Sequence, residues 1–521
     1  MAARTPPASS TPPASSTLPA ALRQAAAEHA GHPAVVEGDR TLSFSELLDR
    51  VQNVAKGYLA HGFEAGDRLA LWAPNSTDWI VAGLAASYAG GTLVPINSRY
   101  TGHEAADIID RTRATVVVVD DGFLGRSQIA ELRGASELAS VREIVRIDKL
   151  DRLAEIGADV LTSEVEARAD AVTADDVADI LFTSGTTGRS KGAMSAHRQT
   201  IAVSDAWARI GGVTSEDRYL VVNPFFHSFG YKIGIVVSLL TGATLYPVAT
   251  FDVDAVMELI ETEQITLLPG APTIFTSLFD APGRAERDLS SLRLSITGAA
   301  VVPVVLIERM RAPAPAGLGI DHVYTAFGMT EAVVVTMCRE GDPDDVVANT
   351  CGRAIPGVEV RIGDRDELLV RGDIVMLGYL DDPAATAEAI DEDGWLHTGD
   401  VGRLDEAGNL TITDRLKDMY ISGGFNVYPA EVEQALARMD GVADVAVIGV
   451  PDDRMGEVGK AFVVPRAGTS IGTDDVIAFA RERLANYKVP RQVVFTDALP
   501  RNLGGKVLKN ELRQARQPGV S

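Results

Sequence analysis

Short runs of β-branched and aliphatic residues alternate with helix-like stretches along much of the chain, and this alternation constrains the fold more than any other feature. The stretch ATVVVVDDG (Ala114–Gly122) is continuously apolar at its centre, as in a strand buried on both faces. Before it, DRLALWAPNS (Asp67–Ser76) is typical of a strand ending in a turn, and TDWIVAGLAASYAGG of a helix closed by Gly90 and Gly91. Strand-like runs return in DRYLVVNPFFHSFG, ITLLPGAP and LRLSITGAA. The sequence therefore predicts an α/β fold of parallel sheets covered by helices.

The pattern changes after Gly352, where VEVRIGDRDELLVRGDIVMLGYL shows the short alternating runs and turn residues of a small antiparallel β subdomain. A second boundary is expected near Asp414–Tyr420. Beyond it, PAEVEQALARM predicts a helix that begins at Pro429, and VADVAVIGV and KAFVVPR predict two strands. The next stretch, DDVIAFARERL, predicts a helix capped by Thr473. These elements are sufficient for a separate α+β domain.

The 521 residues are therefore expected to form three parts. Residues 1–20 contain TPPASS twice and lack an apolar signal core, which predicts a disordered tail rather than an export signal. Residues 21–416 are expected to form a large N-terminal domain of two parallel-type α/β subdomains plus the small β subdomain. Residues 417–521 are expected to form a small, mobile C-terminal domain. More than one domain is expected because single hydrophobic cores stop growing at about 250–300 residues.

Charge and cysteine content limit the partners. The 48 Lys and Arg against 72 Asp and Glu give a net charge of −24, which disfavours nucleic acid and anionic membranes. A bound polyphosphate would therefore need positive groups and a metal gathered locally. Cys338 and Cys351 are the only cysteines, so no disulfide framework is expected and a cytoplasmic protein fits. No membrane span is expected, and the apolar stretch from Ile233 (IGIVVSLLTGATLYPVA) predicts a buried helix followed by a strand.

The stretch TSGTTGRSKG (Thr183–Gly192) has the composition of a phosphate-binding loop. Its glycines let backbone N–H groups approach phosphate oxygens, and its hydroxyls add further donors. In the P-loop signature the lysine is followed by Ser or Thr, whereas Lys191 is followed by glycine, and Gly185 and Gly188 have the wrong spacing. The pattern therefore predicts a different phosphate clamp, whose metal ligand lies elsewhere. A flexible polar linker is the alternative, and the strand-like entry ADILF disfavours it.

Other stretches carry polar groups that such a site needs. YTAFGMTE (Tyr324–Glu331) ends in a hydroxyl beside a carboxylate, a pair suited to a phosphate oxygen and Mg²⁺. GWLHTGD (Gly394–Asp400) places a carboxylate after a turn, where it could bind a ribose diol. TDRLKDMYISGGFNVYP adds Arg415 and Lys417, and PRNLGGKVLK puts Lys506 on a glycine-flanked loop. Because charged loop residues are usually solvated, each stretch alone is a weak indication.

Together, the clamp SGTTG, then GMTE, TGD, DRLKD and the C-terminal GK resemble the adenylate-forming superfamily of acyl-CoA synthetases, adenylation domains and beetle luciferases. The resemblance covers Leu22–Leu512 and implies ATP, Mg²⁺ and coenzyme A as cofactors and a small carboxylic acid as substrate. The carboxylate attacks the α-phosphate of ATP to make an acyl-adenylate and pyrophosphate, and a thiol then displaces AMP. Because two anions must approach each other, fixed cations and donors are expected around the reacting phosphate.

The resemblance also implies roles for residues at the matching positions. Thr330 binds phosphate, Glu331 holds Mg²⁺, and Asp400 binds the ribose hydroxyls, assisted by Arg415. Lys506 contacts the substrate carboxylate and the α-phosphate side of the reaction. The other implied ATP- and AMP-binding residues are Thr183, Ser184, Gly185, Thr186, Thr187, Gly188, Lys191, Gly298, Ala299, Ala300, Phe327, Gly328 and Met329.

The same resemblance implies two domain orientations. The small domain rotates about a hinge at Lys417, which withdraws Lys506 after adenylation. The rotation brings Ser422, Gly423 and Gly424 to the site, where they form the tunnel for CoA.

The acid is expected to bind beside His227, which matches a family position near the carboxylate and the thiol entry. A satisfied core histidine is the alternative. The acyl pocket is assigned to Phe226, His227, Gly298 and Phe327. Many members have Tyr where Phe327 stands, so stacking on adenine is kept and a hydroxyl contact is lost. Lys191 either contacts phosphate directly or steers loop closure, and both alternatives remain open.

The stretches FFHSFGYK, PGAPT and TGAAVVP favour an apolar acid, and the absence of a following carrier domain favours free CoA as acceptor. Within the superfamily, DILFTSGTTGRSKG and NPFFHSFGYK resemble the CoA ligases of actinobacterial steroid catabolism. That resemblance implies the bicyclic indane-dione propanoate left after rings A and B are degraded. The alternatives are a medium-chain fatty acyl-CoA synthetase, an enzyme that loads a carrier protein, a luciferase-like monooxygenase and a non-catalytic ATP-binding protein. Monomer and homodimer remain open.

Overall fold

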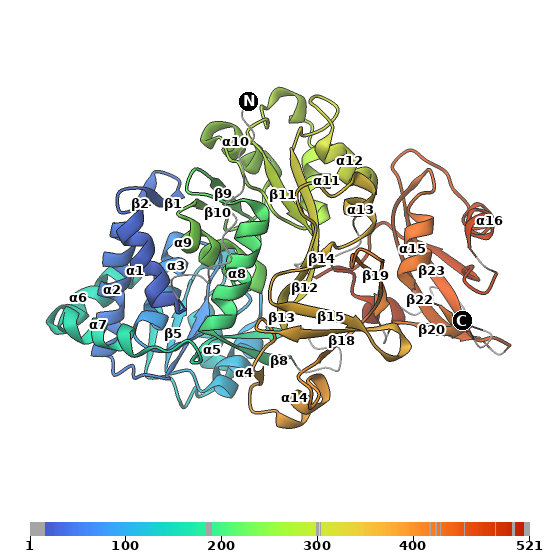
Figure 1. Cartoon of the computed structure of the whole chain (residues 1–521). Helices are drawn as coiled ribbons and strands as arrows, with labels where there is room; N and C mark the ends of the chain where they lie inside the picture. The colour runs from blue at the N-terminus through green and yellow to red at the C-terminus, as the bar shows by residue number, and fades with distance from the viewer. Residues whose placement is uncertain are drawn as a thin grey trace.

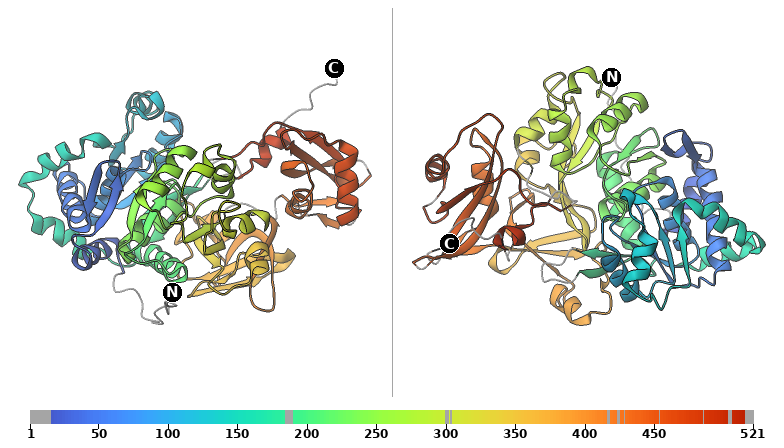
Figure 2. Two further views of the ribbon diagram at one scale, coloured as in Figure 1. Left: turned by 90° about the horizontal axis from the view of Figure 1, so that it is seen from above. Right: turned by 180° about the vertical axis from the view of Figure 1, so that it is seen from behind.

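The structure, a computed structural model, has a large N-terminal part and a smaller C-terminal lobe at one side of it (Figures 1 and 2). It describes residues 16–183, 190–298, 302, 304–415, 418–422, 425–427, 429–452, 454–484, 486–502 and 506–514, without the side chains of residues 414, 415, 425 and 426. Among these residues, no helix combines the length and the apolar character needed to cross a membrane. The predicted two-part α/β architecture is confirmed.

A seven-stranded sheet forms the first subdomain, in the order β17-β8-β7-β4-β3-β5-β6. Strands β7, β4, β3, β5 and β6 are parallel, whereas β8 is antiparallel to both of its neighbours. All four valines of β5 are buried because helices cover both faces. Leu69 and Leu71 of β3 join the core with α2 and α3, and Ala70 and Trp72 join the core with α4 on the opposite face. The elements are α2 (Phe44–Ala60), β3 (Arg68–Trp72), α3 (Thr77–Tyr88), β4 (Thr92–Pro95), α4 (Gly102–Thr112), β5 (Val116–Val119), α5 (Gln128–Ala135), β6 (Glu143–Arg146), α6 (Leu150–Ile156), α7 (Thr162–Ala171), β7 (Val177–Thr183), β8 (Lys191–Ala196) and β17 (Gly378–Tyr379).

The second subdomain contains two four-stranded paths, β2-β1-β10-β9 and β11-β12-β13-β14. Single parallel bridges from Leu267 to Tyr219 and Leu294 join them, so the predicted strand in ITLLPGAP is present only as isolated bridges. The strands are β1 (Pro33–Glu37), β2 (Arg40–Ser43), β9 (Arg218–Val221), β10 (Thr244–Pro247), β11 (Leu294–Thr297), β12 (His322–Met329), β13 (Ala332–Met337) and β14 (Arg353–Ala354). The helices are α8 (His197–Gly211), the π-helix η4 (Phe229–Val236), α9 (Val237–Thr241), α10 (Val253–Glu263), α11 (Pro272–Asp280), α12 (Val304–Arg311) and α13 (Asp344–Asn349).

The small antiparallel subdomain is also confirmed, with strand order β15-β16-β18-β19. Its elements are β15 (Val358–Ile362), β16 (Glu367–Gly372), α14 (Pro383–Ala389), β18 (Leu396–Leu404) and β19 (Leu410–Arg415).

The C-terminal lobe has its own sheet, β21-β20-β23-β22 with β24 beside β23, and its own buried core. The helix predicted at Pro429 is α15, whereas the predicted cap at Thr473 is wrong. Thr473 is the first residue of α16, and Gly472 is the cap, since its N–H donates to Asp475 Oδ2 (2.8 Å). The elements are β20 (Tyr420–Ser422), β21 (Phe425–Val427), α15 (Pro429–Leu436), β22 (Val442–Asp452), β23 (Gly456–Pro465), α16 (Thr473–Arg483), β24 (Gln492–Phe495) and α17 (Lys509–Gln514).

The expected boundary of the disordered tail is wrong at its C-terminal side. The helix α1 (Leu18–Glu28) begins inside residues 1–20, and the Thr17 side chain caps it by accepting from Ala20 N. Leu18 is almost fully buried, because the first turn packs into the N-terminal core. Residues 1–15 lie outside the described residues.

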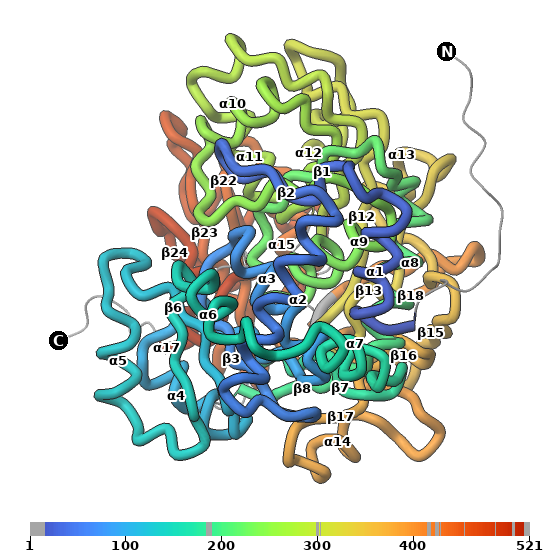
Figure 3. Tube along the Cα trace, turned by 90° about the vertical axis from the view of Figure 1, so that its left-hand side faces the viewer, coloured from blue at the N-terminus to red at the C-terminus, as the bar shows by residue number. Residues whose placement is uncertain are grey.

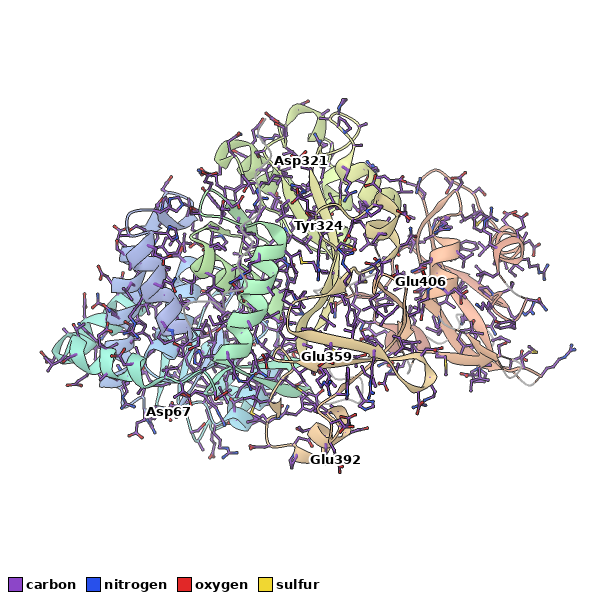
Figure 4. All side chains as sticks on the ribbon, viewed as in Figure 1. Asp67, Asp321, Tyr324, Glu359, Glu392 and Glu406 are labelled. Carbon is purple, nitrogen blue, oxygen red and sulfur yellow. The ribbon has the colours of Figure 1, made fainter. Side chains whose placement is uncertain are left out.

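The acidic excess is spread over the surface. Asp321, Glu359, Glu392 and Glu406 are exposed, and Figure 4 shows them at separate places around the molecule. Such a distribution favours solvation of the charges over a single acidic binding face.

Candidate active site

The predicted phosphate clamp connects two antiparallel strands, β7 and β8. Thr183, the last residue of β7, pairs with Lys191, the first residue of β8, and Thr183 Oγ1 donates to the Lys191 carbonyl at 3.4 Å. A P-loop joins a strand to a helix, so its exclusion is confirmed by the two antiparallel strands. The predicted clamp residues Ser184, Gly185, Thr186, Thr187 and Gly188 lie outside the described residues.

Thr330 and Glu331 form the two-residue turn of a second hairpin, between β12 and β13, where Met329 pairs with Ala332. Gly328 is required at the entry to this turn. A Cβ atom there would lie 1.9 Å from the Val333 carbonyl oxygen, so any side chain would clash with backbone. The Glu331 residue is only 8% exposed, which makes its carboxylate a buried group that needs partners.

Tyr379 of β17 connects these two hairpins. Its hydroxyl donates to Glu331 Oε1 at 2.8 Å, and the Lys191 Nζ atom lies 4.9 Å from the centroid of its ring. Burial, followed by the nearby Glu331 charge, raises the pKa of Tyr379 well above its ordinary value, so the hydroxyl remains a donor. Sequence reasoning missed Tyr379, because its only signal was an aromatic residue in the turn-like stretch LGYL.

The residues around Glu331 suit Mg²⁺ bound together with a polyphosphate. Among the described residues, no three His, Cys, Asp or Glu side chains are grouped to enclose a metal ion. Mg²⁺ is commonly held by one or two carboxylates, with phosphate oxygens and water completing its shell. A single buried carboxylate at the tip of a hairpin has the donor chemistry for that arrangement.

Asp400 and Arg415, predicted to bind the ribose together, are directly opposite each other in the β18–β19 ladder. Asp400 is 3% exposed, and its N–H donates to Thr398 Oγ1 at 3.1 Å. The predicted adenine residues also come together, since the pairing of Thr297 with Thr325 places Gly298 beside Ala326, the neighbour of Phe327. Ala299 and Ala300, and the side chain of Arg415, lie outside what the structure describes.

His227 lies just before η4, and π-helical segments often occur at functional sites. The residue is exposed, unlike a core histidine, and its Nδ1 accepts from Phe229 N at 3.2 Å. Desolvation by the surrounding protein nevertheless lowers the pKa of His227, which favours the neutral imidazole. The half-buried Phe226, the other acyl-pocket residue of this stretch, is its immediate neighbour.

Asn75, which sequence reasoning also missed, fixes the loop that carries His227. Its Oδ1 accepts from Phe225 N at 2.7 Å, and its Nδ2 donates to the Asn223 carbonyl at 2.9 Å. The residue follows β3 and is 3% exposed. The only signal was an Asn in a turn after a buried strand.

The backbone of Lys506 is held by Asn502 in the C-terminal lobe. Its N–H donates to Asn502 Oδ1, and the Asn502 N–H donates back to the Lys506 carbonyl, both at 2.9 Å. Ser422 is buried in β20, opposite Gly456 of β23. The predicted hinge Lys417 and the predicted CoA-tunnel glycines Gly423 and Gly424 lie outside the described residues.

Comparison with known proteins identifies the family. The AMP-binding enzyme family matches residues 22–380, and the AMP-binding enzyme C-terminal domain matches residues 431–506. The chain is 56% identical over 509 residues to the 3-[(3aS,4S,7aS)-7a-methyl-1,5-dioxo-octahydro-1H-inden-4-yl]propanoyl:CoA ligase of Rhodococcus jostii, covering 95% of this chain and 98% of that protein. It is 55% identical over 501 residues to the Mycobacterium tuberculosis ligase of the same name, with the same coverage. ATP-bound MatB from Rhodopseudomonas palustris has a TM-score of 0.87 and 31% identity, covering 96% of this chain and 98% of that one. The chain therefore belongs to the AMP-binding enzyme family.

Proposed function

We propose that this protein is an AMP-forming acyl-CoA ligase that activates a bicyclic indane-dione propanoate derived from a steroid. The observation that carries the proposal is the near-full-length identity of 56% and 55% to two ligases named for that acid. The acid is a bicyclic hydrocarbon ring system with two ketone groups and one carboxylate. His227 is exposed on the loop that Asn75 holds, and apolar side chains lie next to it in the sequence. This combination of a polar ring and apolar side chains suits an acid with an apolar skeleton and one carboxylate.

In the adenylation step, the Thr183–Gly192 clamp binds the β- and γ-phosphates, and Thr330 also binds phosphate. Glu331 binds Mg²⁺, which would neutralise part of the phosphate charge when bound. Asp400, opposite Arg415, binds the ribose hydroxyls, and Lys506 orients the acid carboxylate against the α-phosphate. The carboxylate oxygen forms a bond to phosphorus while the bond to pyrophosphate breaks, so the donors act on charge that grows during the reaction.

In the second step, the CoA thiolate attacks the acyl carbon and AMP leaves. We propose that, before this attack, the C-terminal lobe turns about Lys417, so that Lys506 leaves and the segment around Ser422 faces the site. Neutral His227 adds no positive charge at the thiol entry and positions the reacting groups. The proposed compartment is the cytoplasm, because both described cysteines are free thiols, as expected in a reducing environment.

The proposal is tested by supplying ATP, Mg²⁺ and CoA with a panel of steroid-derived bicyclic propanoates and linear medium-chain acids. AMP and acyl-CoA are quantified by mass spectrometry. The bicyclic propanoate is expected to give the highest kcat/KM. Better turnover of every linear acid would support a fatty acyl-CoA synthetase, and transfer to a phosphopantetheine carrier but not to CoA would support a carrier-loading enzyme.

A further inference from the structure

A short segment joins the two hairpins that carry the proposed phosphate and metal groups. Met376 N donates to the Glu331 carbonyl, Leu377 N to the Met194 carbonyl, and Leu380 N to the Gly192 carbonyl, each at 2.8 Å. The segment 376–380 is thus bonded to the Thr330–Glu331 turn at one end and to β8 over the rest of its length. Figure 3 shows β17 at the lower edge of the molecule, next to α14 and close to β7 and β8.

The side chain of Tyr379 also joins the two hairpins. The hydroxyl holds the Glu331 carboxylate at 2.8 Å, and the ring face lies 4.9 Å from the Lys191 ammonium. The backbone of Tyr379 is fixed as well, since its N–H donates to Thr386 Oγ1 of α14 at 2.9 Å. One residue therefore contacts the proposed metal ligand and the clamp cation, from a backbone held on both sides.

The position of Tyr379 prevents a direct ion pair between Lys191 and Glu331. Lys191 and Glu331 have opposite charges, and a direct ion pair would occupy the groups that a magnesium–polyphosphate complex needs. Among the described side chains the two do not pair with each other; each contacts Tyr379 instead. The ring face attracts the cation while the hydroxyl satisfies one carboxylate oxygen, so the tyrosine acts as a spacer between them.

We propose that Tyr379 is a positioning residue that keeps Glu331 and Lys191 apart and correctly oriented for the magnesium and pyrophosphate end of ATP. The inference rests on the proposed function, because it takes Glu331 as the metal ligand and Lys191 as part of the phosphate clamp. Tyr379 acts through these two residues and forms no bond to the reacting atoms.

Two substitutions separate the contacts. Tyr379→Phe keeps the ring under Lys191 and removes the hydroxyl from Glu331, whereas Tyr379→Leu removes both. We expect Tyr379→Phe to weaken MgATP binding about tenfold in equilibrium titrations, the usual scale for a lost hydrogen bond to a charged group. ATP binding in EDTA should stay at the wild-type value for Tyr379→Phe and weaken for Tyr379→Leu. Thiolysis of preformed acyl-AMP should be unchanged in both variants.

Tyr88→Phe is a matched control, because Tyr88 also donates from its hydroxyl to a glutamate, Glu166 Oε1, at 2.7 Å, but between α3 and α7. It should leave MgATP binding unchanged. Glu331→Gln distinguishes a failure of the Tyr379 positioning role from a failure of the assignment of Mg²⁺ to Glu331. If Glu331→Gln weakens MgATP binding and Tyr379→Phe does not, the positioning role is wrong while the metal assignment stands. If neither variant alters MgATP binding, the assignment of Mg²⁺ to Glu331 fails and the positioning role fails with it.

Discussion

The imidazole of His197 is an example of a single residue whose charge state is set by packing. It begins α8, is 1% exposed, and its Nδ1 accepts from Leu18 N at 3.2 Å, which attaches α1 to α8. Burial lowers the pKa of His197 from 6.5 to about 4. The folded protein therefore holds this imidazole neutral at pH values where the unfolded chain would protonate it.

The lowered pKa of His197 predicts that acid destabilises the folded protein. Between pH 6.5 and about 4 the unfolded state binds more protons at His197, so the free energy of unfolding falls as the pH is lowered. The full loss is about 3 kcal/mol, reached near pH 4. His197→Asn keeps an acceptor for Leu18 N and cannot titrate. Urea unfolding between pH 7 and 4 should show a smaller pH slope for this variant, and equal slopes would contradict the prediction.

At the scale of elements, a buried ion pair joins the clamp hairpin to the π-helix. Lys232 Nζ of η4 lies 3.0 Å from Asp179 Oδ1 of β7 and donates to Ser195 Oγ of β8 at 2.8 Å. Thr200 Oγ1 of α8 donates to Asp179 Oδ2 at 2.9 Å. The Lys232 and Asp179 side chains are 1% and 0% exposed, so neither charge has water as a substitute partner.

Removing one partner of this ion pair should therefore lower the free energy of unfolding more than removing both partners. We expect Lys232→Met to lower the free energy of unfolding by about 3–5 kcal/mol, because Asp179 would be left buried and unpaired. The double variant Lys232→Met with Asp179→Leu should recover much of this loss. All four tryptophans precede residue 417, so tryptophan fluorescence in urea reports the N-terminal part alone. A double variant as unstable as Lys232→Met would argue against charge burial as the cause.

At the scale of the whole molecule, the C-terminal lobe is stabilised by contacts of its own. Lys509 Nζ lies 2.8 Å from Glu433 Oε1, Lys488 Nζ lies 2.6 Å from Glu431 Oε1, and a separate apolar core lies beneath the sheet. A lobe with its own core can rotate as a unit. This agrees with the proposal that Lys506, which lies on this lobe, serves adenylation and not thiolysis.

Lys506→Ala should accordingly separate the two half-reactions. Acyl-AMP formation, followed by ATP–pyrophosphate exchange, is expected to fall by about 10²–10³, the usual effect of removing one charge-stabilising group. Thiolysis of supplied acyl-AMP should stay near the wild-type rate. Arg481→Ala removes an exposed cation from α16 of the same lobe and should affect neither step. Equal losses in both half-reactions for Lys506→Ala would show that the lysine has no step-specific role.

Much of the architecture was predictable because strand burial leaves a local signal. Four consecutive valines in β5 and the helix beginning at Pro429 were expected from sequence and are present. The start of α1 was missed because Leu18 is ordered by packing against the core, which no short stretch records. The cap of α16 is a local feature, since Asp475 lies three residues after Gly472 and accepts from its N–H, but the prediction placed the cap one residue too late.

The sequence by itself determined the strand–helix alternation, the non-P-loop register of the clamp, and the residue types of the candidate site, because these depend on burial patterns and side-chain chemistry over short stretches. Only the tertiary structure decided that Tyr379 lies between Lys191 and Glu331, that Asn75 holds the loop of His227, and that Lys232 pairs with Asp179. These contacts join residues far apart in the chain. Their positions follow from how the sheets and helices pack against one another. This packing depends on many side chains together, so no single stretch of the sequence predicts it.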